Sequence, residues 1–323
     1  MEKIEHIKVK KDMKVSELVE EMEKAGFGAE KIGKASSIMK KMFDDKECTV
    51  FFGVAGAMVP AGMKQIILDI LDYSKVFVTT GANLTHDLIE SLGESHYQGD
   101  DAVDDTDLNK QGIDRIYNVF MKNSVYEKLE EFFEKNFEEL KKCGNIREFL
   151  WKLGELSPGD GILKKCYEKR IPIFCPGIAD SGIGLMMWSA TTVKRTLQPP
   201  TDSSAMHPNQ ERLVNSKEKN QANIMVFDDM KEIIDIAWIS KKSGVIYIGG
   251  GLPKNFIQQS LQFSKGADYG IQITTDRTEP GGSSGAPLRE GISWGKMKKD
   301  AEFVDVFCDA TIALPIILAS IKE

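Results

Sequence analysis

The sequence is poor in the residues that build metal centres and disulfide frameworks. Its five cysteines, at positions 48, 143, 166, 175 and 308, include no Cys-x-x-Cys pair, and it has only four histidines. Zinc sites and disulfide-linked domains need closely spaced cysteines or histidines, so the sequence predicts neither. Scattered cysteines of this kind are typical of buried thiols in a reducing compartment, and we expect the protein to be cytoplasmic.

Two further absences narrow the possible partners. No apolar run approaches the roughly 20 residues of a membrane-spanning helix, and the charged N-terminus has no signal-peptide pattern. The formal net charge is −7, and basic clusters such as 296–299 are local, which disfavours binding to nucleic acid or to an anionic membrane. A chain of 323 residues, 41% of them hydrophobic, is long enough to bury a large core.

What the sequence does contain is a repeated alternation of short apolar strands with helices. Strands are predicted at 48–53, 76–80, 171–175, 223–227, 243–248, 267–274 and 303–307. Helical periods follow several of them, at 63–71, 229–240, 253–263 and 311–321. This alternation is typical of a parallel sheet covered on both faces, so we predict a Rossmann-like, doubly wound α/β fold.

Four other segments carry different patterns. Residues 1–45 form a helical segment, which could pack on a neighbouring subunit or cover the core of the domain that we place at 46–323. Residues 100–107 are acidic and are expected to form a loop, whereas 118–143 have the period of a long charged helix. Residues 197–221 are polar without periodicity, which indicates a long exposed loop.

Turns of glycine and other small residues follow several predicted strands. Because the carboxyl ends of parallel strands meet at one edge of a sheet, these turns should line a common crevice. Backbone N–H groups at such an edge suit the pyrophosphate of a dinucleotide, and an acid there can bind a ribose. The first turn, 53–62, lacks a strict Gly-x-Gly-x-x-Gly, so these residues alone also fit another metabolite in the crevice.

A glycine-rich loop, residues 279–296, ends in Ser-Trp-Gly-Lys. Glycines let the backbone approach a ligand closely. A lysine sheltered by apolar surface has its ammonium form disfavoured, and the free amine is the nucleophile that forms imines. Trp294 is therefore expected to exclude water around Lys296 and to favour its free amine. A surface loop that ends in a solvated lysine fits the same residues.

Several ordered blocks resemble the deoxyhypusine synthase family and cover the chain from about residue 48 to the C-terminus. They are Thr79-Thr80-Gly81, Pro176 to Asp180, Gly249-Gly250-Gly251, Ser284-Gly285-Ala286, Glu290 with Ser293-Trp294-Gly295-Lys296, and Asp309-Ala310. The resemblance implies a reaction in which NAD takes a hydride from spermidine, a lysine holds the aminobutyl group as an imine, and an acceptor amine displaces that lysine. It also implies homotetramers with sites at subunit interfaces.

The resemblance also assigns roles to individual residues. Lys296 matches the imine-forming lysine. The implied substrate-binding positions are Glu290, Trp294, Ser284, Asn255 and His86. The implied NAD-binding positions are Thr80, Gly81, Ala82, Asp180, Gly250, Thr275, Asp276, Asp309 and Ala310. The sequence departs from the family pattern where acids of the polyamine pocket are replaced, at Thr85-His86, Leu185, Pro280 and Ser283.

We therefore predict an NAD-dependent aminobutyl transferase of hypusine biosynthesis, with a polyamine donor and a lysine of a hypusine-type translation factor as acceptor. One alternative is transfer to a small amine, as in homospermidine synthases, or use of another donor such as agmatine. A second alternative is a catalytically silent nucleotide-binding protein. The retained Lys296, Glu290 and Trp294 favour an enzyme, whereas the replaced acids favour the silent protein.

Overall fold

The computed structural model describes residues 3–191 and 222–322. Its centre is a six-stranded sheet in the order β6-β2-β1-β7-β8-β9, in which every neighbouring pair is parallel. The strands are β1 (Cys48–Val54), β2 (Val76–Thr79), β6 (Ile173–Phe174), β7 (Lys242–Ile248), β8 (Ala267–Thr274) and β9 (Met297–Phe307). The chain builds outward from β1 on one side and then crosses to β7 on the other, which is the doubly wound order of dinucleotide-binding folds. The predicted fold class is confirmed.

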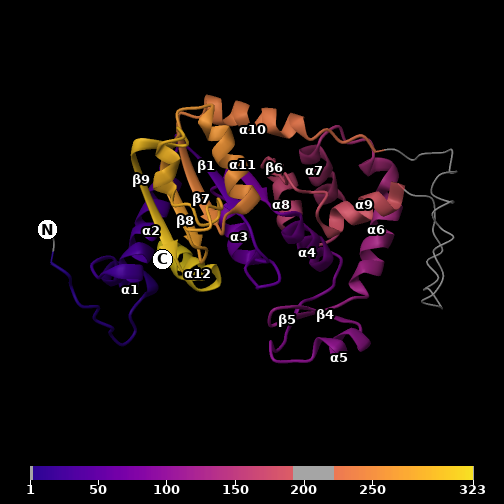
Figure 1. The fold of residues 1–323 in the computed structure, drawn as a ribbon, viewed down its shortest axis with the longest axis horizontal. Helices are drawn as coiled ribbons and strands as arrows, with labels where there is room; N and C mark the ends of the chain where they lie inside the picture. Colours follow the sequence, from indigo (N-terminus) through magenta and orange to yellow (C-terminus); the bar gives the residue numbers. More distant parts are fainter. Residues whose placement is uncertain (1–2, 192–221, 323) are drawn as a thin grey trace.

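Helices cover both faces of this sheet (Figure 1). One face carries α10 (Phe227–Ile239), α11 (Gly251–Gln262) and the 3-10 helix η1 (Leu288–Ile292). The other carries α2 (Phe27–Asp44), α3 (Lys64–Leu71), α4 (Gly81–Ser91), α7 (Ile146–Leu156), α8 (Ile162–Glu168), α9 (Gly182–Thr191) and α12 (Ala310–Lys322). Successive strand residues point to opposite faces. Accordingly, Phe51 lies in the core under α11, and Phe52 lies in the core under α2 and α12.

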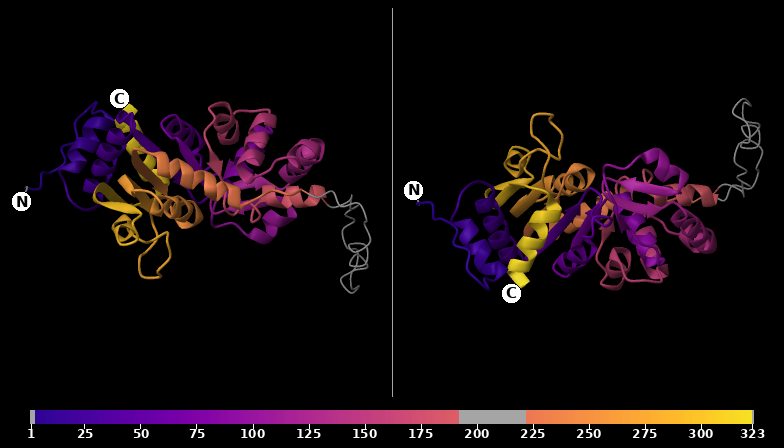
Figure 2. Two further views of the ribbon diagram at one scale, coloured as in Figure 1. Left: turned by 90° about the horizontal axis from the view of Figure 1, so that it is seen from above. Right: turned by 90° about the horizontal axis from the view of Figure 1, so that it is seen from below.

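The N-terminal helices lie against the chain's own core. In α2, Ile32, Ala35, Met39 and Met42 are buried at helical spacing and share a hydrophobic cluster with β1. The helix α1 (Val15–Glu23) packs on α2 and α12, and Figure 2 shows these three helices together at one end of the molecule. Residues up to about 45 therefore cover this end of the sheet.

The region after α4 differs from the prediction. Instead of a loop and one long helix, the chain forms a small antiparallel sheet in the order β3-β5-β4. Its elements are β3 (Tyr97–Gln98), α5 (Asp105–Lys110), β4 (Ile113–Ile116) and β5 (Val119–Lys122), and the long helix α6 spans only Val125–Leu140. Asp104 starts α5 by accepting a hydrogen bond from the Thr106 N–H at 2.7 Å. Tyr117, with φ at +54°, makes the tight turn between β4 and β5, which is an unusual conformation for tyrosine.

The strand predicted at 223–227 is also wrong. These residues contribute only an isolated bridge between Asn145 and Met225, and α10 begins at Phe227. The loop predicted at 197–221 lies outside the described residues. Within the two described ranges, no helix is both long and apolar enough to cross a membrane.

Candidate active site

The winding direction of the chain reverses between β1 and β7, and the turns that follow these two strands touch. Val54 is in register with Ile248, and the Ala55 N–H donates to the Ile248 carbonyl oxygen at 2.9 Å. A Cβ atom placed on Gly249 would lie 3.3 Å from that of Ala55. The crevice outside such a reversal point is where open α/β sheets bind their ligands.

The turns after the other strands meet along the same carboxyl edge. A Cβ on Gly81, after β2, would lie 2.3 Å from the Cβ of Ser181, after β6. A Cβ on Gly250, after β7, would lie 2.3 Å from the Cα of Ser284 in the glycine-rich loop. We call the turns at this edge the carboxyl ring. Of the predicted cofactor residues, it contains Thr80, Gly81 and Ala82 after β2, Asp180 after β6, Gly250 after β7, Thr275 and Asp276 after β8, and Asp309 and Ala310 after β9.

The helices α4, α9, α11 and α12 begin at the carboxyl ring. Thr80 and Asp309 stand before the first turns of α4 and α12, where their side-chain oxygens accept hydrogen bonds from Asn83 N–H and Thr311 N–H. Gly251, at the start of α11, has a φ of +55°, and nothing lies within 4 Å of the place that a Cβ would occupy. Open space in front of a helix N-terminus suits a phosphate, and carboxylates nearby suit ribose hydroxyls, so these residues fit a dinucleotide.

A buried lysine that the sequence reasoning missed anchors the glycine-rich loop. Lys254, in the first turn of α11 and 1% exposed, donates to Gln272 Oε1 at 2.7 Å and to the carbonyl oxygens of Ser283 at 2.7 Å and Ala286 at 2.5 Å. Gln272 Nε2 in turn donates to the Ser284 carbonyl oxygen at 2.6 Å. Burial lowers the pKa of Lys254 to about 8, because the ammonium is disfavoured away from water. The one sequence signal was a lysine on the otherwise apolar inner face of a helix.

The predicted catalytic lysine lies farther along the α11 face. Lys296 Nζ is 5.1 Å from the centroid of the Trp294 ring, and Glu290 is exposed on η1. Trp294 is itself 56% exposed, so in one chain it does not exclude water from the lysine as the sequence suggested.

The position of Lys296 along the sheet separates it from the carboxyl ring of the same chain. Its carbonyl oxygen accepts a hydrogen bond of 3.0 Å from the N–H of Ala267, at the amino end of β8. Thr274 ends the same strand, about 23 Å away at roughly 3.3 Å per residue. That distance, taken along the backbone of the strand, exceeds the length of a lysine side chain, although Lys296 is near enough to Lys254 to influence its pKa. Asn255 and Ser284 lie near the ring, whereas Glu290, Trp294 and Lys296 lie toward the other end of the strand.

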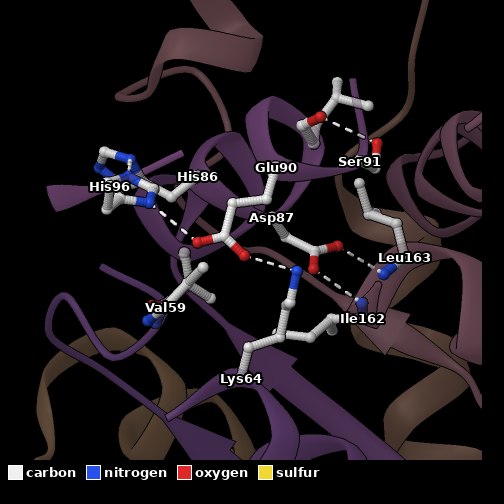
Figure 3. A network of polar contacts seen from close by, with 11 residues as sticks. Val59, Lys64, His86, Asp87, Glu90, Ser91, His96, Ile162 and Leu163 are labelled. Carbon is white, nitrogen blue, oxygen red and sulfur yellow. Dashed lines mark hydrogen bonds and ion pairs between the residues drawn. The ribbon is translucent and has the colours of Figure 1, made fainter. Parts of the chain in front are cut away.

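His86 lies across the sheet from Lys296. Leu84 and Leu88 of α4 belong to the core cluster of one face, and Leu288 and Met297, on either side of Lys296 in sequence, belong to that of the other. His86 Nδ1 is 2.9 Å from His96 Nε2 (Figure 3). Burial, and then the neighbouring His96, lower the pKa of His86 to about 4, so its imidazole is neutral near pH 7.

The described residues contain no cluster of three or more histidine, cysteine or acidic side chains placed to hold a metal ion. The five cysteines are all free thiols, and burial raises the pKa of Cys166 and lies behind similar shifts at Cys48 and Cys175.

Comparison with known proteins identifies the family to which this sequence and fold belong. The sequence profile "Deoxyhypusine synthase" matches residues 17–321. "Probable deoxyhypusine synthase 1" of Methanosarcina mazei is 39% identical over 320 residues, which cover 98% of this chain and 93% of the relative. The protein of the same name from Archaeoglobus fulgidus is 39% identical over 318 residues, which cover 98% and 96%. A crystal structure from Entamoeba histolytica, titled as a candidate deoxyhypusine synthase, shares the fold with a TM-score of 0.62 at 18% identity, over 96% of this chain and 93% of that one. The chain therefore belongs to the deoxyhypusine synthase family.

Proposed function

We propose that this protein is an NAD-dependent transferase that moves the aminobutyl group of spermidine to a lysine of a hypusine-type translation factor. The observation that carries the proposal is the carboxyl ring at the reversal point of the sheet, joined through Ser284 to the loop that leads to Lys296. NAD, when bound, would supply the hydride acceptor that no side chain can supply. The family membership supports this reaction class.

The carboxyl ring would hold the cofactor through its backbone and its acids. The open N-terminus of α11 at Gly251 suits the pyrophosphate, and Asp180 and Asp309 suit ribose hydroxyls. Ser284 packs directly on Gly250, so it forms a wall of the same crevice. A side chain at Gly250 would displace that wall, which makes this glycine the position where substitution should harm cofactor binding most.

Glu290, Trp294 and Lys296 would handle the amine. A carboxylate at Glu290 can pair with a substrate ammonium that leaves water. The Trp294 ring, which already carries the Lys296 ammonium over its face at 5.1 Å, can hold a substrate cation in the same way. Lys296, as a free amine, attacks the carbon of the substrate imine, and the bond to the departing diamine breaks as that diamine takes up a proton. The acceptor lysine then displaces Lys296 by the same exchange, and return of the hydride that NAD had taken up would reduce the imine on the acceptor to the amine.

The separation of Lys296 from the carboxyl ring leads us to propose that two chains build each site, within a homotetramer. Lys296 of one subunit would reach the ring of its neighbour. Large apolar side chains are exposed on this face, among them Leu252, Phe263 and Trp294 at 55%, 58% and 56%. Such a surface is typical of an interface, and burying Trp294 there would provide the shelter that Lys296 lacks in one chain.

Mixed assemblies test the shared site. Gly250→Val and Lys296→Ala should each abolish transfer alone. Subunits of the two variants, co-expressed in equal amounts, should recover about a quarter of the parental activity, because one shared site in four then has both residues intact. No recovery would show that each chain works alone or that the pairing is different.

The replaced acids favour a second candidate with a different amine. Leu185, where the family pattern has an acid, is 53% exposed and cannot pair with an ammonium. Mass spectrometry of products from purified protein, NAD and either spermidine, putrescine or agmatine, with and without an acceptor protein, separates the candidates. Diaminopropane and a modified acceptor lysine are expected, with borohydride trapping the intermediate on Lys296. Homospermidine or an agmatine product would replace the first proposal with the second, and NAD binding without any product would indicate the silent protein.

A further inference from the structure

A network of polar contacts links α3, α4 and the residue just before the small sheet (Figure 3). Lys64 Nζ lies 2.5 Å from Glu90 Oε2, and Glu90 Oε1 lies 2.9 Å from His96 Nδ1. His96 Nε2 lies 2.9 Å from His86 Nδ1, and His86, on α4, is the last member of this network. The side chain of His96 is only 6% exposed, and those of Lys64 and Glu90 are 25% and 22% exposed. The network is thus largely withdrawn from solvent, and His86 at its end is half-buried.

The carboxylate of Glu90 constrains where the neighbouring histidine ring carries its hydrogen. Burial alone would raise the pKa of Glu90, but hydrogen bonds from His96 and Lys64 hold it below its usual range, so Glu90 is a carboxylate. A carboxylate only accepts, so the His96 Nδ1 that faces Glu90 carries a hydrogen. In the relay proposed below, His96 is neutral before it receives a proton, which makes its Nε2 an acceptor. His86 therefore donates from Nδ1, and its Nε2 is left with a free lone pair.

His86 lies on the helix face that leads to the carboxyl ring. His86 stands one turn after Ala82 on α4, and residues four apart share a helix face. Ala82 is exposed at the ring, next to Gly81 and Thr80. The adjacent Asp87 points away, because its carboxylate accepts from the N–H groups of Ile162 and Leu163 at 2.8 and 2.9 Å (Figure 3). Of the two neighbours, Asp87 anchors α8, whereas the half-buried His86 contacts His96.

We propose that His86 is the proton acceptor for the amine donor and that His96 and Glu90 relay the proton away. The donor nitrogen gives one proton to Nε2 of His86. The Nδ1 proton of His86 passes to Nε2 of His96, which becomes an imidazolium paired with Glu90. The donor keeps its electron pair as a neutral amine, the form from which a hydride can leave. This inference rests on the proposed function for the identity of the ligand.

A histidine at position 86 suits proton transfer better than a carboxylate would. A carboxylate there would hold an ammonium in its charged form, since opposite charges stabilise each other. A neutral imidazole with a bare nitrogen instead accepts the proton, and Glu90, held in turn by Lys64, stabilises the resulting charge at His96. The groups that face this pair are Lys64 from α3 and Glu90 from α4.

Kinetics of amine oxidation test the relay. His96→Gln keeps a hydrogen-bonding side chain but cannot take up and pass on a proton. It should lower kcat for NADH formation with spermidine about a hundredfold while leaving KM and NAD affinity unchanged. His86→Asn should lower kcat similarly, and the double variant should be no slower than either single variant, because the residues act as one unit. His6→Gln, at an exposed N-terminal position, is the matched control. Unchanged kcat in His96→Gln, or losses that multiply in the double variant, would overturn the relay.

A second measurement does not depend on turnover. Nitrogen-15 NMR of histidine-labelled protein at neutral pH reports which ring nitrogen is protonated. Both His86 and His96 should carry hydrogen on Nδ1, and the His86 signals should lose this pattern in His96→Gln. A hydrogen on Nε2 of His86 would overturn the relay directly. If the parent oxidises no amine with NAD, the proposed function fails, and the protonation pattern still decides the arrangement of the network.

Discussion

Replacing Lys254 by methionine probes the anchor of the glycine-rich loop. The substitution removes the ammonium that donates to Gln272 Oε1 and to the carbonyl oxygens of Ser283 and Ala286. A buried acceptor that loses its partner costs about 1–3 kcal/mol, so three acceptors cost at least about 3 kcal/mol. Against this, the parent carries a desolvated ammonium whose pKa has moved from 10.5 to about 8. That shift is a penalty of about 3 kcal/mol at neutral pH.

The two effects nearly offset each other near pH 7, but they depend on pH differently. The folded pKa of Lys254 is below its unfolded value, so between pH 8 and 10.5 the unfolded chain binds more protons and the stability of the parent rises with pH. Lys254→Met lacks this contribution. The free energy of unfolding of the parent, minus that of the variant, should therefore increase by about 2 to 3 kcal/mol from pH 7 to pH 10.

Urea unfolding of both proteins at these two pH values measures the difference, with the exposed Lys265→Met as the control for loss of a surface lysine. Hydrogen exchange of residues 278–288 should also speed up in Lys254→Met and not in the control, because the loop has lost its anchor. A difference in unfolding free energy that stays constant with pH would refute the account of Lys254 as a buried, titrating cation. Unchanged exchange in the loop would refute its role as the anchor.

Three other substitutions give direct tests. Gly250→Val should abolish NAD binding in calorimetric titration, because its Cβ would lie 2.3 Å from the Ser284 Cα; binding at parental affinity would place the cofactor elsewhere. Tyr247→Phe should leave the unfolding free energy unchanged or raise it by about 1 kcal/mol, since the Tyr247 hydroxyl is buried without a partner among the described residues. A clear decrease in the unfolding free energy would show that the hydroxyl does have a hydrogen-bond partner. The parent should lose stability, on the order of 2 kcal/mol after allowing for partial exposure, as the pH falls from 6.5 to 4, because the folded pKa of His86 is about 4 and lies below its unfolded value. His86→Asn should lose less of its unfolding free energy over this range. An equal loss of unfolding free energy in both proteins would contradict this.

The sequence predicted the sheet well because its strands are buried on both faces. Runs such as 48–53 and 243–248 are apolar throughout, and each leads into a glycine turn and a helical period, so local pattern and tertiary role coincide. The small sheet was missed for the opposite reason. Its strands are short and partly exposed, and the turn at Tyr117 relies on a conformation that its residue type does not announce.

Within the site, the residues placed by topology were predictable and those placed by distant contacts were not. The carboxyl ring follows from strand order, because every turn after a parallel strand reaches the same edge. Lys254 is held by carbonyl groups about thirty positions later in the chain, and no local pattern encodes that distance. The pairing of His86 with His96 likewise depends on how the chain returns after α4.

The placement of Lys296 in the fold supports our proposal that two chains build each site. Parallel strands bring their carboxyl ends, and with them the turns that we propose bind the cofactor, to one edge of the sheet. A residue just before a strand lies at the opposite edge. Lys296 directly precedes β9, so the loop that carries it must run back along the α11 face, past Lys254 and η1. It ends about 23 Å from the carboxyl end of β8, with Trp294 exposed beside it. As the proposed nucleophile, Lys296 is half-buried beside an exposed tryptophan and far from the proposed cofactor turns of its own chain, so a neighbouring copy would supply both the cofactor and the shelter.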